Sequence, residues 1–296
     1  MEVTNRTFQG RYLLLPRRGV REIVLGVLGR AQRSFEMPIH AFTFVSNHFH
    51  LLLTPRDAEH LADFMELFES KLAREMNRLH GWAGALWGDR YHSMPIENDE
   101  ETLIARLQYV LSHGVKEDLV ERADEWPGAH CVGALTEDEP LQGKWYDRTA
   151  HYEATRWGKA VDLEEFAVEE EVRLSPLPCW LHLSKEERQD LVRSMVEEIE
   201  ADAVARHRAQ GTRPAGVQAV LAHHPHERPN ALKHSPRPWF HTKTREGLRA
   251  MQEAYRLFAE AFHDAAELLI RGHPNPTFPE GSFPPGRPFV PHQTPG

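Results

Sequence analysis

The stretch Phe42–Leu53, which reads FTFVSNHFHLLL, decides how the N-terminal part of this chain folds. It predicts two short strands separated by a tight break near Ser46. Side chains alternate along the second strand, so His48 and His50 face one side of a sheet and Phe49 faces the other. Imidazole is the commonest side-chain ligand for a divalent metal, and two histidines on one strand form half a metal site. The alternative is that both are ordinary polar residues on a half-exposed strand.

Hydrophobic spacing around this stretch predicts a small α+β unit. Candidate N-cap residues such as Asp57 and stop signals such as Gly81 set the expected helix ends. The expected strands cover residues 3–8, 39–45, 48–54 and 90–97, and the expected helices cover 18–34, 57–80 and 98–114. The order βαββαβ with an added helix predicts a ferredoxin-like antiparallel sheet.

The remainder of the chain is expected to be mostly helical. A capping box at Ser184–Glu187 opens a helix that runs to about Gln210, and a last helix follows from about Thr244. The predicted organisation is a unit over residues 1–134, a poorly structured acidic connector over 135–180, a helical accessory region over 181–272 and a Pro-rich tail over 273–296, extended or disordered.

Composition indicates a globular protein of a reducing compartment. The 296 residues include 27% charged and 41% hydrophobic ones and only two cysteines, Cys131 and Cys179. Two cysteines far apart argue against a disulfide scaffold or a cysteine-based zinc site, and they favour the cytoplasm. The sequence contains no run of about 18 apolar residues, so no membrane span is expected. The first residues lack the apolar core of a signal peptide.

The charge is unevenly distributed. The formal net charge is −9, yet the N-terminal part is rich in arginine and the middle of the chain carries the acidic runs. Because local charge decides the affinity for phosphate, the N-terminal part remains a candidate for nucleic-acid binding. Candidate phosphate-binding residues are Arg6, Arg11, Arg17, Arg18, Arg90 and His92; the alternative for them is ordinary surface charge.

Tyr109 and His113 are four residues apart on the added helix, so they lie on one face of it. By themselves they are compatible with a partly exposed amphipathic helix. Packed against the strand that carries His48 and His50, however, this helix would complete three metal ligands beside a hydroxyl nucleophile. A phenol that attacks phosphorus forms a phosphotyrosine ester, which conserves the bond energy for rejoining a strand.

Further motifs of the N-terminal part are Arg90-Tyr91-His92, Tyr109-Val110, Lys116, Leu119-Val120 and Trp126-Pro127. Together with Ser46–Leu53 and the long helix after it, they resemble the single-tyrosine transposases of the HUH superfamily, in particular the REP-associated tyrosine transposases of bacteria. The resemblance covers roughly residues 1–130.

This resemblance implies an activity and a set of site residues. It implies that His48 and His50 bind Mg²⁺ or Mn²⁺ and that Tyr109 forms a 5′-phosphotyrosine link with single-stranded DNA near a hairpin or palindrome. The family usually has Asn-Pro or Gln at the fourth position after the tyrosine, whereas this chain has His113-Gly114. A third imidazole shifts the preference from Mg²⁺ towards Mn²⁺, Co²⁺ or Zn²⁺.

The sequence therefore predicts a metal-dependent transposase that nicks and transfers single DNA strands, with Tyr109 as nucleophile and His48, His50 and His113 as ligands. Two alternatives stay open at this point. One is a DNA-hairpin-binding module with a regulatory role and weak or no catalysis. The other is a structural zinc protein held together by the three histidines. No membrane partner is expected, and the sequence leaves both a monomer and a homodimer open.

Overall fold

The two-strand stretch forms one edge strand and one central strand of a four-stranded antiparallel sheet. The computed structural model describes residues 1–158, 160–230 and 239–286. The strands are β1 (Glu2–Arg6), β2 (Ile39–Val45), β3 (His48–Leu53) and β4 (His92–Met94), and their order in the sheet is β2-β3-β1-β4. With the helices between them, this is the predicted ferredoxin-like βαββαβ arrangement.

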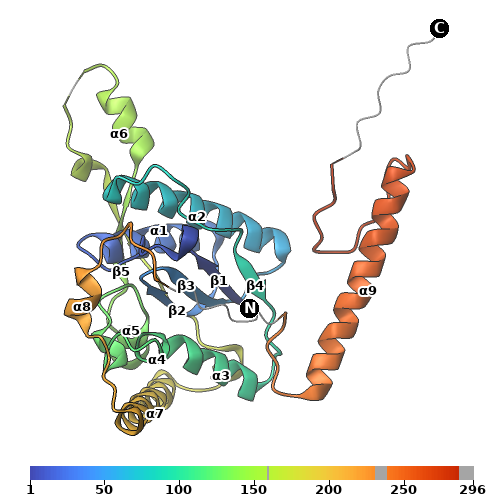
Figure 1. Cartoon of the computed structure of the whole chain (residues 1–296). Helices are drawn as coiled ribbons and strands as arrows, with labels where there is room; N and C mark the ends of the chain where they lie inside the picture. Colours follow the sequence, from blue (N-terminus) through green and yellow to red (C-terminus); the bar gives the residue numbers. More distant parts are fainter. Residues whose placement is uncertain (159, 231–238, 287–296) are drawn as a thin grey trace.

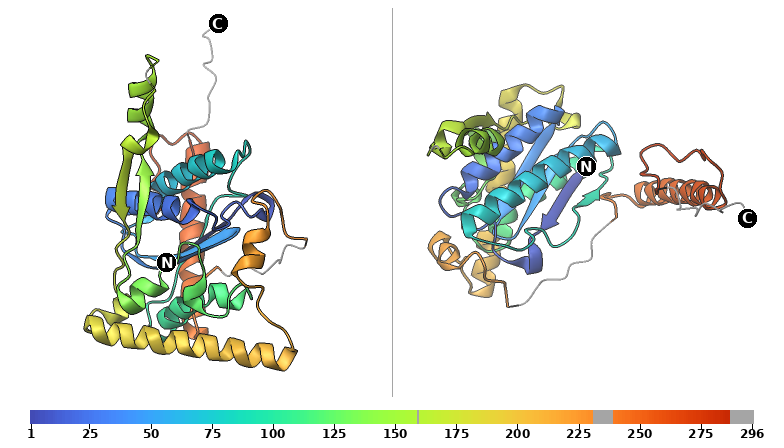
Figure 2. Two further views of the ribbon diagram at one scale, coloured as in Figure 1. Left: turned by 90° about the vertical axis from the view of Figure 1, so that its left-hand side faces the viewer. Right: turned by 90° about the horizontal axis from the view of Figure 1, so that it is seen from above.

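Two helices cover one face of the sheet and a third lies on the other. Helices α1 (Val20–Phe35) and α2 (Ala58–His80) pack side by side above the sheet, and α3 (Glu100–Leu111) lies below it (Figures 1 and 2). The short helix α4 (His113–Lys116) continues the path of α3 after Ser112. The added helix α3 thus lies on the opposite face of the sheet from α1 and α2.

The predicted signals set both ends of α2 and the start of α3, whereas α3 ends at Leu111 and not at the expected residue 114. Asp57 accepts a hydrogen bond from the His60 backbone N–H and opens α2, which ends at Gly81 in the left-handed conformation with φ 60°. Asp99 opens α3 in the same way. The fourth strand is shorter than expected: only His92–Met94 pairs with β1, and Pro95, which has no N–H, follows directly.

The face below α1 and α2 holds an aromatic core. Phe42, Phe44 and Phe49 of the hairpin and Phe64 and Phe68 of α2 are all fully buried. The Phe49 ring stacks on Phe44 at 5.2 Å between centroids and meets Phe68 edge-on at 5.7 Å. Burying one such side chain contributes about 1.5–3 kcal/mol, so this face fixes the hairpin in one register.

The expectation of a poorly structured connector was wrong. After α5 (Val132–Glu137), residues 142–171 form a second, two-stranded sheet from β5 (Gln142–Tyr146) and β6 (Ala167–Glu171), with α6 (Arg148–Thr155) between the strands. This sheet packs on α1 so closely that a Cβ on Gly26 would lie 2.1 Å from the Lys144 backbone.

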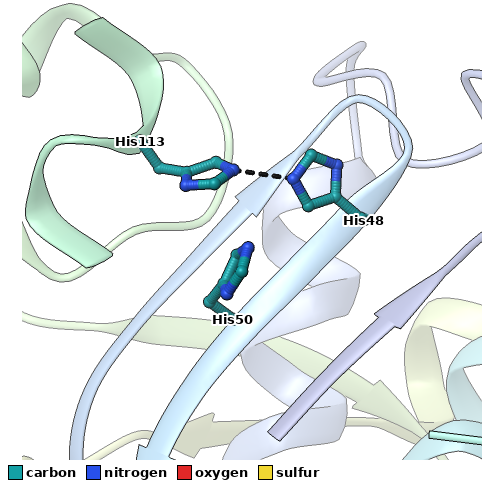
Figure 3. Close-up of side chains that lie close together, drawn as sticks. All are labelled: His48, His50 and His113. Carbon is teal, nitrogen blue, oxygen red and sulfur yellow. Dashed lines mark hydrogen bonds between the residues drawn. The ribbon is translucent and has the colours of Figure 1, made fainter. Parts of the chain in front are cut away.

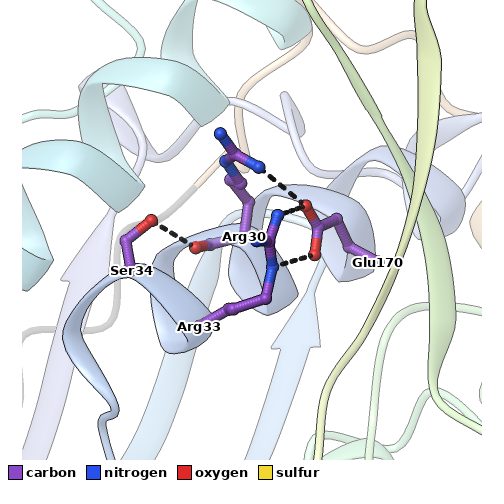
Figure 4. Close-up of polar contacts among 4 residues, drawn as sticks. All are labelled: Arg30, Arg33, Ser34 and Glu170. Atoms are coloured by element: carbon purple, nitrogen blue, oxygen red, sulfur yellow. Dashed lines mark hydrogen bonds and ion pairs between the residues drawn. The ribbon is translucent and has the colours of Figure 1, made fainter.

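A buried carboxylate paired with two partly exposed arginines fastens the second sheet to α1. The Glu170 side chain of β6 is 5% exposed; Arg33 contacts both its oxygens, at 3.0 Å and 2.6 Å, and Arg30 contacts one at 3.2 Å (Figure 4). The acidic residues of this region are therefore not all solvent-exposed charges of a linker. One of them is neutralised by helix α1, which hydropathy alone does not reveal.

The C-terminal region is mostly helical, as predicted. Its helices are α7 (Lys185–Gln210), α8 (Val217–Ala222) and α9 (Arg245–Ile270), and the capping box of Ser184 with Glu187 opens α7. Helix α7 packs near α3, α4 and α5, whereas α9 stands beside the sheet edge formed by β4 (Figure 1). In the described part of the chain, no helix is long and apolar enough to cross a membrane.

The predicted division of the chain at residues 134, 180 and 272 stays a prediction. Of the predicted Pro-rich tail, residues 287–296 lie outside the described residues.

Candidate metal and nucleophile site

The strand face that is turned towards α3 carries polar side chains. Alternation along β1 and β3 places Glu2, Thr4 and Arg6 on this face together with His48 and His50. In the register of the sheet, Thr4 lies opposite His50 and Arg6 lies opposite His48. We call this surface the site face, and the opposite surface under α1 and α2 the core face.

Three histidines meet between the site face and the end of α3. The Nε2 atoms of His48 and His113 are 2.7 Å apart, and the ring centroids of His50 and His113 are 4.4 Å apart (Figure 3). One ligand atom from each ring falls within 4.8 Å of the others, so the group could hold a metal ion. The structure thus brings together the three histidines that the sequence proposed.

Neighbouring groups orient two of the three imidazoles. Asn47 Oδ1 accepts a hydrogen bond from His48 Nδ1 at 2.7 Å, and Glu2 Oε1 accepts one from His50 Nδ1 at 2.7 Å. With Nδ1 protonated in both rings, each Nε2 keeps its lone pair for a cation. An imidazole whose second nitrogen donates to an oxygen is the usual arrangement of a metal ligand, so the donor set fits a divalent ion.

His113 has no such support. Its Nδ1 is buried and has no hydrogen-bond partner among the described residues. Burial lowers the pKa of His113 well below its ordinary value, and the adjacent imidazoles of His50 and His48 lower it further. The ring is therefore neutral at physiological pH, which a ligating imidazole requires.

Glu2 is a site residue that the sequence analysis missed. Its carboxylate is 1% exposed and contacts His50, Arg106 and His241, the last two at 2.6 Å and 2.8 Å through Oε2. Burial alone would raise the pKa of Glu2, but the imidazoles of His241 and His50 and the charge of Arg106 outweigh it and lower the pKa. Only the register of β1 against β3 could have identified Glu2, because no local motif surrounds it.

Tyr109 lies beside the three histidines. Its ring centroid is 5.3 Å from that of His50 and 5.5 Å from that of His113. The Arg106 guanidinium carbon and the Lys116 Nζ lie 4.1 Å and 4.0 Å from the ring centroid. Burial raises the pKa of the Tyr109 phenol and Glu2 raises it further, whereas Arg106 lowers it. The phenol therefore keeps its proton at neutral pH and must release it during an attack.

The predicted phosphate-binding residues separate into two groups. Arg6 and His92 lie on the site face: Arg6 is two residues from Thr4 along β1, and His92 pairs with Thr4 across β1 and β4. Arg90 precedes β4, and its guanidinium carbon lies 5.4 Å from the centroid of the Tyr91 ring.

Two of the other arginines contact the backbone of the segment that follows α8. Arg11 donates to the carbonyl of His226, and Arg17 donates to the carbonyl of His223 at 2.6 Å. Arg18 is exposed. These residues stay predictions as DNA contacts, and two of them also fasten the segment that follows α8.

Comparison with known families supports one assignment. Residues 8–113 match the family model described as "Transposase IS200 like". The matched range includes His48, His50, Tyr109 and His113 and leaves out Glu2. A comparison with curated proteins found no significant match.

Proposed function

We propose that the protein cuts and rejoins single-stranded DNA near hairpins, since residues 8–113 match the family model described as "Transposase IS200 like". Tyr109 is the proposed nucleophile. The observation that carries the proposal is the position of its ring, 5.3 Å from His50 and 5.5 Å from His113, beside the three-histidine group.

The proposed reaction is an exchange of phosphoester bonds. The Tyr109 phenol oxygen attacks the phosphorus and loses its proton, the P–O bond to the upstream 3′ oxygen breaks, and that oxygen gains a proton. The products are a 5′-phosphotyrosine link and a free 3′-hydroxyl. Rejoining reverses the same step with another 3′-hydroxyl, so it needs no external energy source.

His48, His50 and His113 would hold a divalent cation, with Mg²⁺ and Mn²⁺ as the candidates. When bound, the cation polarises the phosphate and favours the attack. A set of three imidazoles favours Mn²⁺ over Mg²⁺, because Mg²⁺ prefers oxygen ligands.

The surroundings of Tyr109 suit a polyanion. Arg106 and Lys116 bring two positive charges to its ring, and Arg6 and His92 share the site face. Arginine and lysine near a phosphate stabilise the additional negative charge that develops during the attack. Within this arrangement, the chain's residues bind the backbone and orient the phenol.

The test uses a single-stranded oligonucleotide that contains a hairpin and a label at its 3′ end, incubated with Mn²⁺. The labelled downstream fragment should migrate with the unmodified protein on a denaturing gel. Tyr109→Phe removes one hydroxyl and should abolish this adduct while hairpin affinity stays within about twofold. Tyr91→Phe is the matched control and should keep the adduct.

Two results would contradict the proposal. An adduct that persists in Tyr109→Phe places the nucleophile elsewhere. Hairpin binding by the unmodified protein without any adduct, on palindromes that flank its gene, would instead support the DNA-hairpin-binding module.

A further inference from the structure

The environment of Glu2 differs from that of an ordinary structural carboxylate. Its side chain is 1% exposed, and its two oxygens have different partners. Oε1 accepts a hydrogen bond from His50 Nδ1, while Oε2 contacts Arg106 and His241. Glu2 lies outside the residues that match the family model.

The hydrogen bond to His50 has a direct consequence for that ring. It places the proton on Nδ1, and it directs the unprotonated Nε2 towards His113, whose ring centroid is 4.4 Å away. Carboxylates that bind a ligating imidazole in this way fix its tautomer and raise its basicity.

The second oxygen connects the site to the C-terminal region. His241 Nε2 lies 2.8 Å from Oε2, and the backbone of His241 pairs with the segment after β4. There His241 N–H donates to the Pro95 carbonyl, and Glu97 N–H donates to the His241 carbonyl, both at 2.9 Å. A residue that leads into α9 is thereby held against the carboxylate that orients His50.

Glu170 provides the contrast within the same protein. It is also a buried carboxylate, yet its side-chain partners are Arg30 and Arg33, and no imidazole is among its described ion pairs or hydrogen bonds (Figure 4). It joins two pieces of structure and has no contact with a candidate ligand. Glu2 differs from Glu170 in that one of its oxygens accepts a hydrogen bond from a candidate ligand.

We propose that Glu2 is a positioning residue that fixes the tautomer and orientation of His50, and that His241 couples the C-terminal region to this carboxylate. The inference rests on the proposed function in one respect, because it takes His50 to be a metal ligand. The C-terminal region then supports the site, in addition to any role of its own.

The first test needs no metal. Long-range ¹H–¹⁵N correlation spectra of the metal-free full-length protein report which nitrogen of each histidine ring is protonated. His50 should be protonated at Nδ1 in the unmodified protein. In Glu2→Gln the ring should become a mixture of tautomers, because a neutral amide oxygen accepts the proton more weakly. Glu170→Gln is the matched control and should leave the His50 signals unchanged.

The second test measures Mn²⁺ affinity of the same proteins by titration. Glu2→Gln should bind Mn²⁺ about 10- to 100-fold more weakly, whereas Glu170→Gln should stay within about twofold. His241→Ala keeps the carboxylate and should weaken binding by about two- to tenfold. Thermal unfolding in a chelator shows whether each variant is folded.

The outcomes separate this inference from the proposed function. If the folded Glu2→Gln variant keeps the His50 tautomer and the affinity for Mn²⁺, the inference is wrong even when His48→Ala abolishes binding. If Glu2→Gln does not fold, His241→Ala decides, and unchanged affinity overturns the coupling. If the unmodified protein binds no Mn²⁺, the proposed metal centre fails and this inference fails with it.

Discussion

The two faces of the four-stranded sheet are built from alternate residues of the same strands, and they are held in different ways. The core face buries Phe49 among Phe44, Phe68 and Trp87, with no polar partner required. The site face places His48 and His50 against specific hydrogen-bond acceptors. The difference implies that core-face substitutions should cost stability, whereas site-face substitutions should cost binding and chemistry.

Two carboxyl groups show the same contrast. Glu2 on the site face contacts His50, Arg106 and His241, and these partners lower the pKa of its carboxyl group. Glu69 of α2 lies by the core face, where Asn5 Nδ2 donates to its Oε1 at 2.7 Å. Burial raises the pKa of Glu69 to about 7, although Asn5 and Arg90 lower it. One carboxyl is thus kept ionised and the other is kept partly protonated.

The largest effect is expected on the core face. Phe49→Ala should lower the free energy of unfolding by about 3–5 kcal/mol, because Phe49 is fully buried and the lost ring leaves a cavity. Urea unfolding followed by circular dichroism measures this. A loss below about 1 kcal/mol would show that the aromatic cluster does not hold the hairpin.

On the site face, His48→Ala should weaken Mn²⁺ binding by about 100-fold, since one of three ligands and its Asn47-oriented lone pair disappear. Its stability in a chelator should change by only about 0.5 kcal/mol, because His48 is half-buried. Titration with Mn²⁺ and chelator-treated unfolding measure the two quantities. His182→Ala, which removes an exposed histidine outside the group, is the control. Equal losses of Mn²⁺ affinity in the two variants would contradict a role of His48 as a ligand.

The Glu69 carboxyl predicts a pH dependence of opposite sign to that of a paired carboxylate. Its folded-state pKa of about 7 exceeds the unfolded value of 4.5. Its contribution to stability is therefore complete below pH 4.5 and is lost as the pH rises through 7.

Glu69→Gln keeps an acceptor for Asn5 and should remove this dependence. At pH 8 the variant should be more stable than the unmodified protein by up to about 2 kcal/mol, a figure reduced for the partial solvent contact of the side chain. Unfolding curves at pH 4.5, 6 and 8 test it. Parallel stability–pH curves for both proteins would mean that Glu69 is ionised in the fold.

The smallest effect concerns the arginines. Arg6→Ala should lower the affinity for single-stranded hairpin DNA a few-fold and reduce the slope of log affinity against log salt by about 0.7, the value for one phosphate contact. Arg18→Ala, at an exposed position just before α1, serves as the control. Identical slopes for the two variants would contradict a specific phosphate contact by Arg6.

Local signals in the sequence were sufficient for the hairpin and the main helices. The alternation of Phe42–Leu53 gave β2 and β3 to within a residue, and Asp57, Asp99 and Ser184 each cap the expected helix. The i,i+2 spacing was enough to place His48 and His50 on one face, and the i,i+4 spacing was enough to place Tyr109 near His113. Bringing the two pairs together depended on packing the added helix against β3, which local spacing does not fix.

Non-local pairings could not be predicted in this way. The acidic run around Glu170 resembled a linker because its neutralising partners, Arg30 and Arg33, lie about 140 positions earlier. Glu2 and His241 are even farther apart in the sequence, and their contact exists only through the register of β1 and the pairing of Ile96 with His241. Arg11 and Arg17 donate to a distant backbone segment, which charge patterns do not reveal.

We propose that His48, His50 and His113 together hold a catalytic divalent cation. Pulsed electron paramagnetic resonance of the Mn²⁺-loaded full-length protein detects imidazole nitrogens bound directly to the ion. We expect one Mn²⁺ per chain with three coordinated imidazole nitrogens in the unmodified protein, and two coordinated imidazole nitrogens in His113→Ala. Mn²⁺ that binds without any imidazole nitrogen, or a spectrum that His113→Ala leaves unchanged, would contradict it.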